Sequence, residues 1–154
     1  MNKRYNERLG KVLRSVLEGF AMVFTEEEAQ SGVKPEFEGF VTAKIMFTGD
    51  GRGTIILALP GKFCGILAAN VLGVDPDDEQ ARSNRDDAVK EMINITAGHF
   101  VREEFGEKAV FDLLPPEIGP AAPSEVEELI NSADTSLMAE GYQVIAAAAV
   151  ESAG

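Results

Sequence analysis

One stretch of the sequence places an acid, a second acid, a carboxamide and a glycine at spacings of four, three and four residues: Asp87, Glu91, Asn94 and Gly98. On an α-helix, which turns about 100° per residue, these four positions fall within about 60° of one another. Glu91 and Asn94 would lie one turn apart, so both side chains can enter a cleft on a partner. A carboxamide can both donate to and accept from a water molecule. Because phosphoryl transfer depends mostly on positioning and electrostatics, an amide that orients the attacking water is a sufficient contribution from the protein.

The ordinary interpretation of this ridge of four residues is solvated surface, since exposed Asp, Glu and Asn usually have no other role. Three features favour a functional interpretation. Asn94 and Gly98 are poor helix residues at mid-helix positions, where Ala or Glu would be better by several tenths to about 1 kcal/mol. A glycine on an exposed face lets another backbone approach closely. An apolar edge with one basic residue flanks the ridge and predicts a docking surface for a partner; it comprises Ile95, Val101, Arg102 and Phe105.

The residue inventory excludes several other kinds of site. The chain has one cysteine, Cys64, and one histidine, His99, which excludes an intramolecular disulfide, a cysteine-cluster zinc site and a multi-histidine metal centre. The two carboxylates and the amide of the ridge could hold a hard cation, but no second group of ligands accompanies them, so we expect no metal of the protein's own. No nucleophile is paired with a base. Cys64 lies in an apolar stretch and is expected to be a small buried hydrophobe.

Composition bounds the class of protein. With 154 residues, of which 45% are hydrophobic and 26% charged, the chain is expected to form one domain over residues 1–154. Its formal net charge of −12 argues against nucleic acid or an anionic membrane surface as the main partner. The longest apolar runs are shorter than the roughly 20 residues that cross a bilayer, and we expect no secretory signal. A reduced, cytoplasmic protein is therefore expected.

Hydrophobic spacing predicts the helices that must position the ridge. An amphipathic stripe predicts a helix over about residues 6–26, ending in the acidic stretch Thr25–Glu28. The ridge helix starts with Asp75 as its cap or restarts near Ser83, and it runs to about Glu104. Its predicted core face lies opposite the ridge and consists of Val89, Met92, Ile93, Thr96 and Phe100.

Alternation of apolar and polar residues predicts the strands. A β-hairpin pairs the run ending at Thr48 with Thr54–Leu59, and the glycine-rich segment 49–53 between them is its turn. The other expected elements are short helices over 63–71 and 124–131, a loop over 119–123, and strands over 110–113, 135–139 and 142–150. This order predicts an α/β (α+β) sandwich, with a mixed or antiparallel sheet of about five to six strands packed with two long helices.

The ridge resembles the motif of the CheC/CheX/FliY chemotaxis phosphatases. The residues that carry the resemblance are Asp87-x-x-x-Glu91-x-x-Asn94, followed by Gly98 and, further along the chain, by Pro115 and Pro116. The match is closest to the CheX type, which has one such helix. The order of the predicted elements also fits that family over nearly the whole chain.

The resemblance implies a phosphatase that acts on the aspartyl phosphate of a CheY-like response-regulator receiver. In that family the motif glutamate pairs with the receiver's lysine and the asparagine aligns water for in-line attack, roles that would fall to Glu91 and Asn94. Asp87 matches the first acid of the motif, with a supporting role. The family proline maps to Pro116 or to its neighbour Pro115. The Mg²⁺ belongs to the receiver, so no cofactor of this chain's own is implied.

The family also implies how many sites and how many copies to expect. The CheC type has a second site on its first helix; here Ser15-x-x-Glu18-x-x-Ala21 stands in the comparable place, and since Ala21 has no carboxamide, that copy should be inactive. CheX-type proteins form homodimers through their sheets. A homodimer is therefore expected, with the strand over 142–150 as the edge that pairs.

Two other functions stay open. A non-catalytic receiver-binding or scaffold module on the same fold would bind without turnover, although the intact pair of Glu91 and Asn94 argues against it. An enzyme or binder of a small ligand would use a pocket under the glycine-rich hairpin, for which the sequence supplies no convergent polar groups.

Overall fold

The computed structural model describes residues 3–27, 39–132 and 135–152. The described helices are α1 (Lys3–Phe20), α2 (Gly61–Leu72), α3 (Glu79–Ser83), α4 (Arg85–Phe105) and α5 (Pro123–Ser132). The described strands are β1 (Thr25–Glu27), β2 (Phe40–Gly49), β3 (Gly51–Pro60), β4 (Phe111–Leu113), β5 (Glu117–Pro120), β6 (Thr135–Ala139) and β7 (Tyr142–Ser152).

The strands form one antiparallel sheet in the order β1-β6-β7-β3-β2-β4, with β5 also paired to β2. The predicted α+β sandwich with two long helices is confirmed. The described sheet has seven strands, more than expected from the sequence. The strand over 142–150 is not an edge: β7 pairs with β6 on one side and β3 on the other, so the prediction that it forms an edge for a dimer is wrong.

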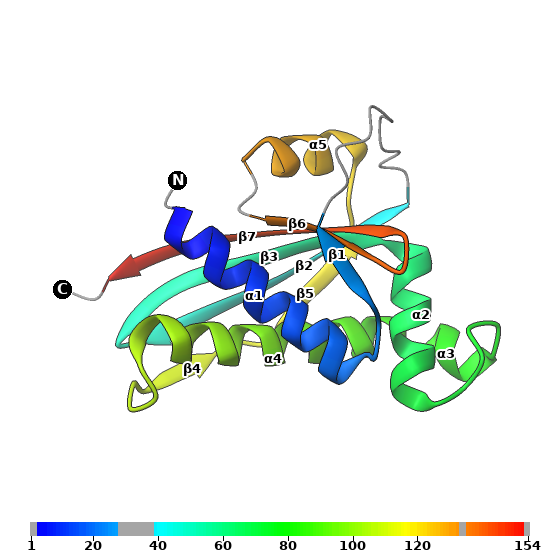
Figure 1. Ribbon diagram of the computed structural model, residues 1–154, viewed down its shortest axis with the longest axis horizontal. Helices are drawn as coiled ribbons and strands as arrows, with labels where there is room; N and C mark the ends of the chain where they lie inside the picture. The colour runs from blue at the N-terminus through cyan, green and yellow to red at the C-terminus, as the bar shows by residue number, and fades with distance from the viewer. Residues whose placement is uncertain (1–2, 28–38, 133–134, 153–154) are drawn as a thin grey trace.

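The helices lie on both faces of the sheet. The long helices α1 and α4 cover one face, where α1 lies over β6 and β7 and α4 over β2 and β3, and α5 covers part of the other face (Figure 1). The main core fills the space between the sheet and the two long helices. A smaller cluster, in which Val126 of α5 packs on Phe40, Ala58 and Ile145, fills the second interface.

The first helix is shorter than predicted. It ends at Phe20 rather than near residue 26, and Met22 takes a left-handed conformation with φ of 54° that turns the chain. The acidic stretch after it forms β1, in which Thr25 pairs with Ala139 of β6. The Arg14 guanidinium donates to the Thr25 hydroxyl at 2.9 Å and holds this strand against α1. Pairing with a distant strand overrides the local helical pattern here.

The ridge helix begins after a break. Asp78, not Asp75, caps the short helix α3, because its carboxylate accepts from the Gln80 N–H at 2.8 Å. Asp75 accepts from the Asp77 N–H at 3.0 Å and stabilises the preceding turn. Asn84 interrupts the helix, and α4 starts at Arg85, which confirms the restart near Ser83.

The predicted hairpin forms with a narrower turn than expected. Strand β2 runs to Gly49 and β3 starts at Gly51, so Asp50 alone separates them. The Asp50 N–H donates to the Val110 carbonyl at 3.1 Å, and the Asp50 carboxylate accepts from the Val110 N–H at 2.9 Å. These bonds hold the hairpin tip to the segment that follows α4. A Cβ at Gly49 would meet the Val110 carbonyl oxygen, so only glycine fits there.

Strand β5 was not predicted, since residues 119–123 were expected to be a loop. Its register places Thr42 of β2 opposite Gly119 and Val41 opposite Pro120. A proline at the end of an edge strand is tolerated because no neighbour needs its missing N–H.

Candidate functional site

Helix α4 turns one face to the core, as its spacing predicts. The five residues of the predicted core face are fully buried: Val89, Met92, Ile93, Thr96 and Phe100. The Thr96 hydroxyl, the polar group on this face, donates to the Met92 carbonyl at 2.8 Å. The opposite side of the helix, which carries the ridge, therefore faces away from the core.

The ridge residues lie where the helical spacing puts them. Asp87 and Glu91 are exposed, and Asn94 and Gly98 are half-buried. Within the described residues, neither Glu91 nor Asn94 has a hydrogen-bond or ion-pair partner. One turn of helix separates them, so a carboxylate and a carboxamide with unused hydrogen-bonding capacity stand side by side on a rigid element.

Gly98 leaves open space on the ridge. A Cβ built on it would meet only a guanidinium nitrogen of Arg102, at 3.5 Å, which is an ordinary contact. The packing of this chain therefore does not require a glycine at this position. The same contact shows that the exposed Arg102 side chain lies along the ridge, next to Gly98.

Of the predicted docking edge, Val101 belongs to the core and Phe105 is half-buried against it. Val101 is only 4% exposed and packs in the main cluster, so its prediction as a surface residue is wrong. Phe105 is partly buried among aromatic rings, 6.3 Å from Phe47 and 5.0 Å from Phe111 between centroids. Strand β4, which carries Phe111, covers the last turn of α4 because it pairs with β2. Ile95 and Arg102 remain at the surface.

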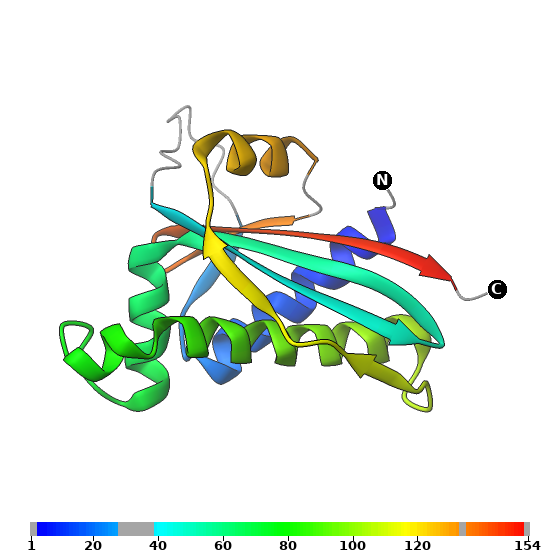
Figure 2. The same ribbon diagram turned by 180° about the vertical axis from the view of Figure 1, so that it is seen from behind.

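An apolar flank beside the ridge comes instead from the segment after α4. Val110, Leu113 and Leu114 are 72%, 38% and 38% exposed. The chain from β4 to β5 crosses beside α4 (Figure 2), and α4 contacts both strands. This segment includes the exposed Pro115 and the half-buried Pro116. The exposure of the two leucines was not predicted, because a short run after a helix carries no periodicity that shows which side is exposed.

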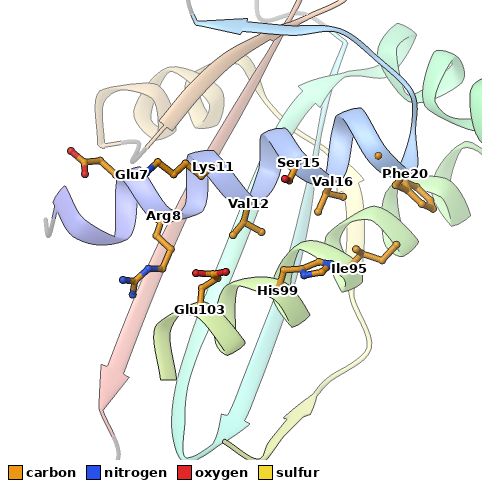
Figure 3. Close-up of a pocket in the computed structure, with 11 residues that line it drawn as sticks. Glu7, Arg8, Lys11, Val12, Ser15, Val16, Phe20, Ile95, His99 and Glu103 are labelled. Atoms are coloured by element: carbon orange, nitrogen blue, oxygen red, sulfur yellow. The ribbon is translucent and has the colours of Figure 1, made fainter. Parts of the chain in front are cut away.

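A groove of about 640 Å³ lies between α1 and α4 (Figure 3). Ile95, His99 and Glu103 line it from α4. Ile95 directly follows the ridge residue Asn94 in the sequence, and His99 directly follows Gly98. The remaining lining residues come from α1: Glu7, Arg8, Lys11, Val12, Ser15, Val16, Gly19 and Phe20.

The comparable segment of α1 presents no amide to solvent. Ala21, at the position of the missing carboxamide, is fully buried, and its carbonyl accepts from Asn70 at 2.9 Å. Glu18 accepts from the Thr25 hydroxyl at 3.3 Å. The ridge of α4 has no counterpart of the same composition on this helix.

The remaining reactive groups do not form a second site. Burial raises the pKa of the Cys64 thiol to about 12, against an opposing effect of Arg85, so the thiol is not a nucleophile at neutral pH. In the described parts of the chain, no three His, Cys, Asp or Glu side chains are grouped so as to hold a metal ion. None of the described helices is long and apolar enough to cross a membrane.

Comparison with known proteins identifies the family. The family model described as chemotaxis phosphatase CheX matches residues 41–136, a range that includes the whole of α4 and both prolines. No curated protein matches the chain at a significant level of sequence similarity.

Solved structures share the fold across nearly the full length. A CheX protein from Desulfovibrio desulfuricans is 14% identical over 96% of this chain and 99% of its own, with a TM-score of 0.69. CheX from Vibrio vulnificus is 18% identical over 96% and 99%, with a TM-score of 0.66. A chain of the CheX–CheY–BeF3–Mg²⁺ complex from Borrelia burgdorferi is 22% identical over 96% and 97%, with a TM-score of 0.65. Because the family model spans more than half of its residues, the chain belongs to the CheX family of chemotaxis phosphatases.

Proposed function

We propose that this chain hydrolyses the aspartyl phosphate of a CheY-like receiver domain. The observation that carries the proposal is the geometry of α4, on which Glu91 and Asn94 share one exposed ridge and have no partner among the described residues. The family is described as a chemotaxis phosphatase, and its Borrelia burgdorferi member was solved in complex with CheY.

In this proposal Asn94 positions the nucleophile. Its carboxamide accepts from and donates to one water molecule, and so holds the water in line with the phosphorus. The water oxygen forms the new bond to phosphorus while the bond from phosphorus to the aspartyl oxygen breaks. The products are inorganic phosphate and the free aspartate of the receiver. The Mg²⁺ that the receiver carries offsets charge on the phosphoryl oxygens.

Glu91 and Asp87 orient the two proteins. Glu91, one turn before Asn94, pairs with the lysine of the receiver and so fixes where the amide enters the receiver's site. Asp87 lies one turn earlier, in the first turn of α4, where the positive end of the helix dipole stabilises an acid. Arg102 and Ile95 contact the receiver around the same ridge, and Gly98 permits a close approach. Pro116 or Pro115 supports the ridge from the β4–β5 segment.

Dephosphorylation of a panel of purified phosphorylated receivers tests the proposal. Wild-type protein should accelerate loss of phosphate from at least one receiver. Asn94→Ala should lose about 10²–10³-fold in kcat, the cost of removing one positioned hydrogen-bonding group from a reacting site. Asn131→Ala is the matched control, because Asn131 is an exposed amide on α5, on the other face of the sheet. If no receiver is accelerated but one binds equally to both proteins, the chain is a non-catalytic receiver-binding module.

We also propose that the protein is a homodimer, as its family resemblance implies, and that it is cytoplasmic, as expected from its residue inventory. The edges of the described sheet are β1 on one side and β4 with β5 on the other, so strand pairing between copies would use one of these. Sedimentation of the purified protein at micromolar concentration distinguishes a dimer from a monomer.

A further inference from the structure

The groove between α1 and α4 has an apolar end and a charged end. Val12, Val16 and Phe20 point from α1 toward α4, and Ile95 points back toward them (Figure 3). The two valines are buried, whereas Phe20 and Ile95 are half-buried. At the apolar end, the buried valines therefore form the base of the groove, and the partly accessible Phe20 and Ile95 form its sides. This arrangement can accommodate an apolar side chain of a partner.

The charged end carries an ion pair and side chains of both signs. Arg8 forms an ion pair with Glu104, whose side chain is only 3% exposed, and this pair ties α1 to α4. The groove is lined by two basic residues, Arg8 and Lys11, and by two acidic ones, Glu7 and Glu103. With Glu104, three acidic and two basic side chains meet at this end, so it has little net charge in a chain whose net charge is −12, and a docked partner meets little like charge there.

Gly19 keeps one wall of the groove low. It lies in the last turn of α1 and is exposed, and a Cβ built on it would meet nothing within 4 Å. Gly10 of the same helix is different, because its Cβ would lie 2.8 Å from the Thr135 hydroxyl oxygen. Glycine is the least favourable helix residue apart from proline, so a glycine that packing does not require has another reason to be there.

The groove continues the ridge. Ile95 follows Asn94 in sequence, His99 follows Gly98, and both line the groove. A partner protein that covers Asn94 and Gly98 therefore also lies next to Ile95 and His99. Gly98 on α4 and Gly19 on α1 share the property that packing within the chain does not require them.

We propose that the groove between α1 and α4 is the pocket that holds an apolar side chain of the receiver docked on the ridge. This inference rests on the proposed function for the identity of the occupant. Gly19 gives the receiver's chain access, and Phe20, Val16 and Ile95 surround the inserted side chain. The groove thereby contributes to affinity and to the choice between receivers, while Glu91 and Asn94 act on the phosphoryl group.

A ring placed on the α1 wall tests access to the groove. Gly19→Phe adds this ring where a Cβ meets nothing within 4 Å, so it fills the groove without displacing a neighbour. Ser15→Phe, one turn earlier on the same wall, is a second blocking variant, because Ser15 is exposed and lines the groove. Glu127→Phe places the same ring on the exposed side of α5, across the sheet, and is the control for a new surface aromatic. Circular dichroism checks that each variant is folded.

Two measurements on each variant test the inference. Gly19→Phe and Ser15→Phe should raise the KM for the phosphorylated receiver by about tenfold or more, the usual effect of losing a buried anchor, with kcat unchanged. They should weaken binding of the BeF3-activated receiver, measured by calorimetry, by the same factor, while Glu127→Phe matches wild type. An unchanged affinity in both folded blocking variants overturns the groove proposal. Turnover by wild type reports separately on the proposed function. If wild type binds the receiver without turnover and Gly19→Phe weakens this binding, the groove proposal is supported and the phosphatase proposal is refuted. If wild type does not bind the receiver, both proposals are refuted.

Discussion

Gly98→Ala should make the protein more stable and less active. The change adds one methyl group to the middle of α4 on the half-buried ridge. The new Cβ meets only the mobile end of Arg102, at 3.5 Å, so it needs no rearrangement. Alanine is better than glycine inside a helix by about 1 kcal/mol, because it loses less backbone entropy on folding. We therefore expect a gain of about 1 kcal/mol in the free energy of unfolding, or about 2–4 °C in Tm for a domain of this size.

Activity should change in the opposite direction. If the backbone of the receiver approaches Gly98 closely, the methyl group occupies part of that space. Overpacking by one such group costs about 1–3 kcal/mol, which corresponds to a loss of about 5-fold to 160-fold in kcat/KM.

Urea unfolding and receiver dephosphorylation measure the two effects on the same preparation. Gly10→Ala is the matched control on stability, because its Cβ would lie 2.8 Å from the Thr135 hydroxyl oxygen and the helix gain should be offset. A Gly98→Ala protein with unchanged or lower stability would show that Gly98 is needed for folding. A stabilised protein with wild-type kcat/KM would show that nothing approaches the ridge at this point.

Two further predictions concern side chains packed in the core or against it. Phe105→Ala should lower the free energy of unfolding by about 3 kcal/mol, since it removes a ring packed on Phe47 and Phe111. Chemical denaturation measures this change. A variant with wild-type stability and a raised KM would show instead that Phe105 contacts the receiver. Burial raises the pKa of Cys64 from 9.0 to about 12, so the thiol ionises at lower pH in the unfolded chain than in the folded one. The free energy of unfolding should therefore fall as pH rises above 9.0, and urea unfolding at several alkaline pH values should show a shallower fall in Cys64→Ala. Equal slopes in the two proteins would contradict this assignment.

The local pattern of α4 predicted its buried and exposed faces because helical periodicity depends only on neighbours along the chain. Val89, Met92 and Phe100 are buried, and Asp87 and Glu91 are exposed, as their spacing requires. The two antiparallel strands at the C-terminal end were also predicted, although alanine is a weak strand former.

The features that sequence reasoning missed all depend on distant partners. Val101 falls near the ridge on a helical wheel, yet it is buried in the main core cluster, which brings together residues of the sheet and of other helices. Strand β1 exists because Thr25 pairs with β6, far along the chain. The groove arises where two helices far apart in the sequence meet, and neither helix alone indicates that Gly19 and Ile95 line the same groove.

In the proposed reaction, Asn94 orients the water that attacks a receiver's aspartyl phosphate. Single-turnover loss of phosphate, from a phosphorylated receiver saturated with wild type or with Asn94→Ala, measures this role, because saturation removes any difference in docking. We expect Asn94→Ala to be at least as stable as wild type, since alanine is the better helix former, and to bind the receiver, but to be slower by about 10²–10³-fold. An Asn94→Ala protein that dephosphorylates the receiver at the wild-type rate would contradict this role.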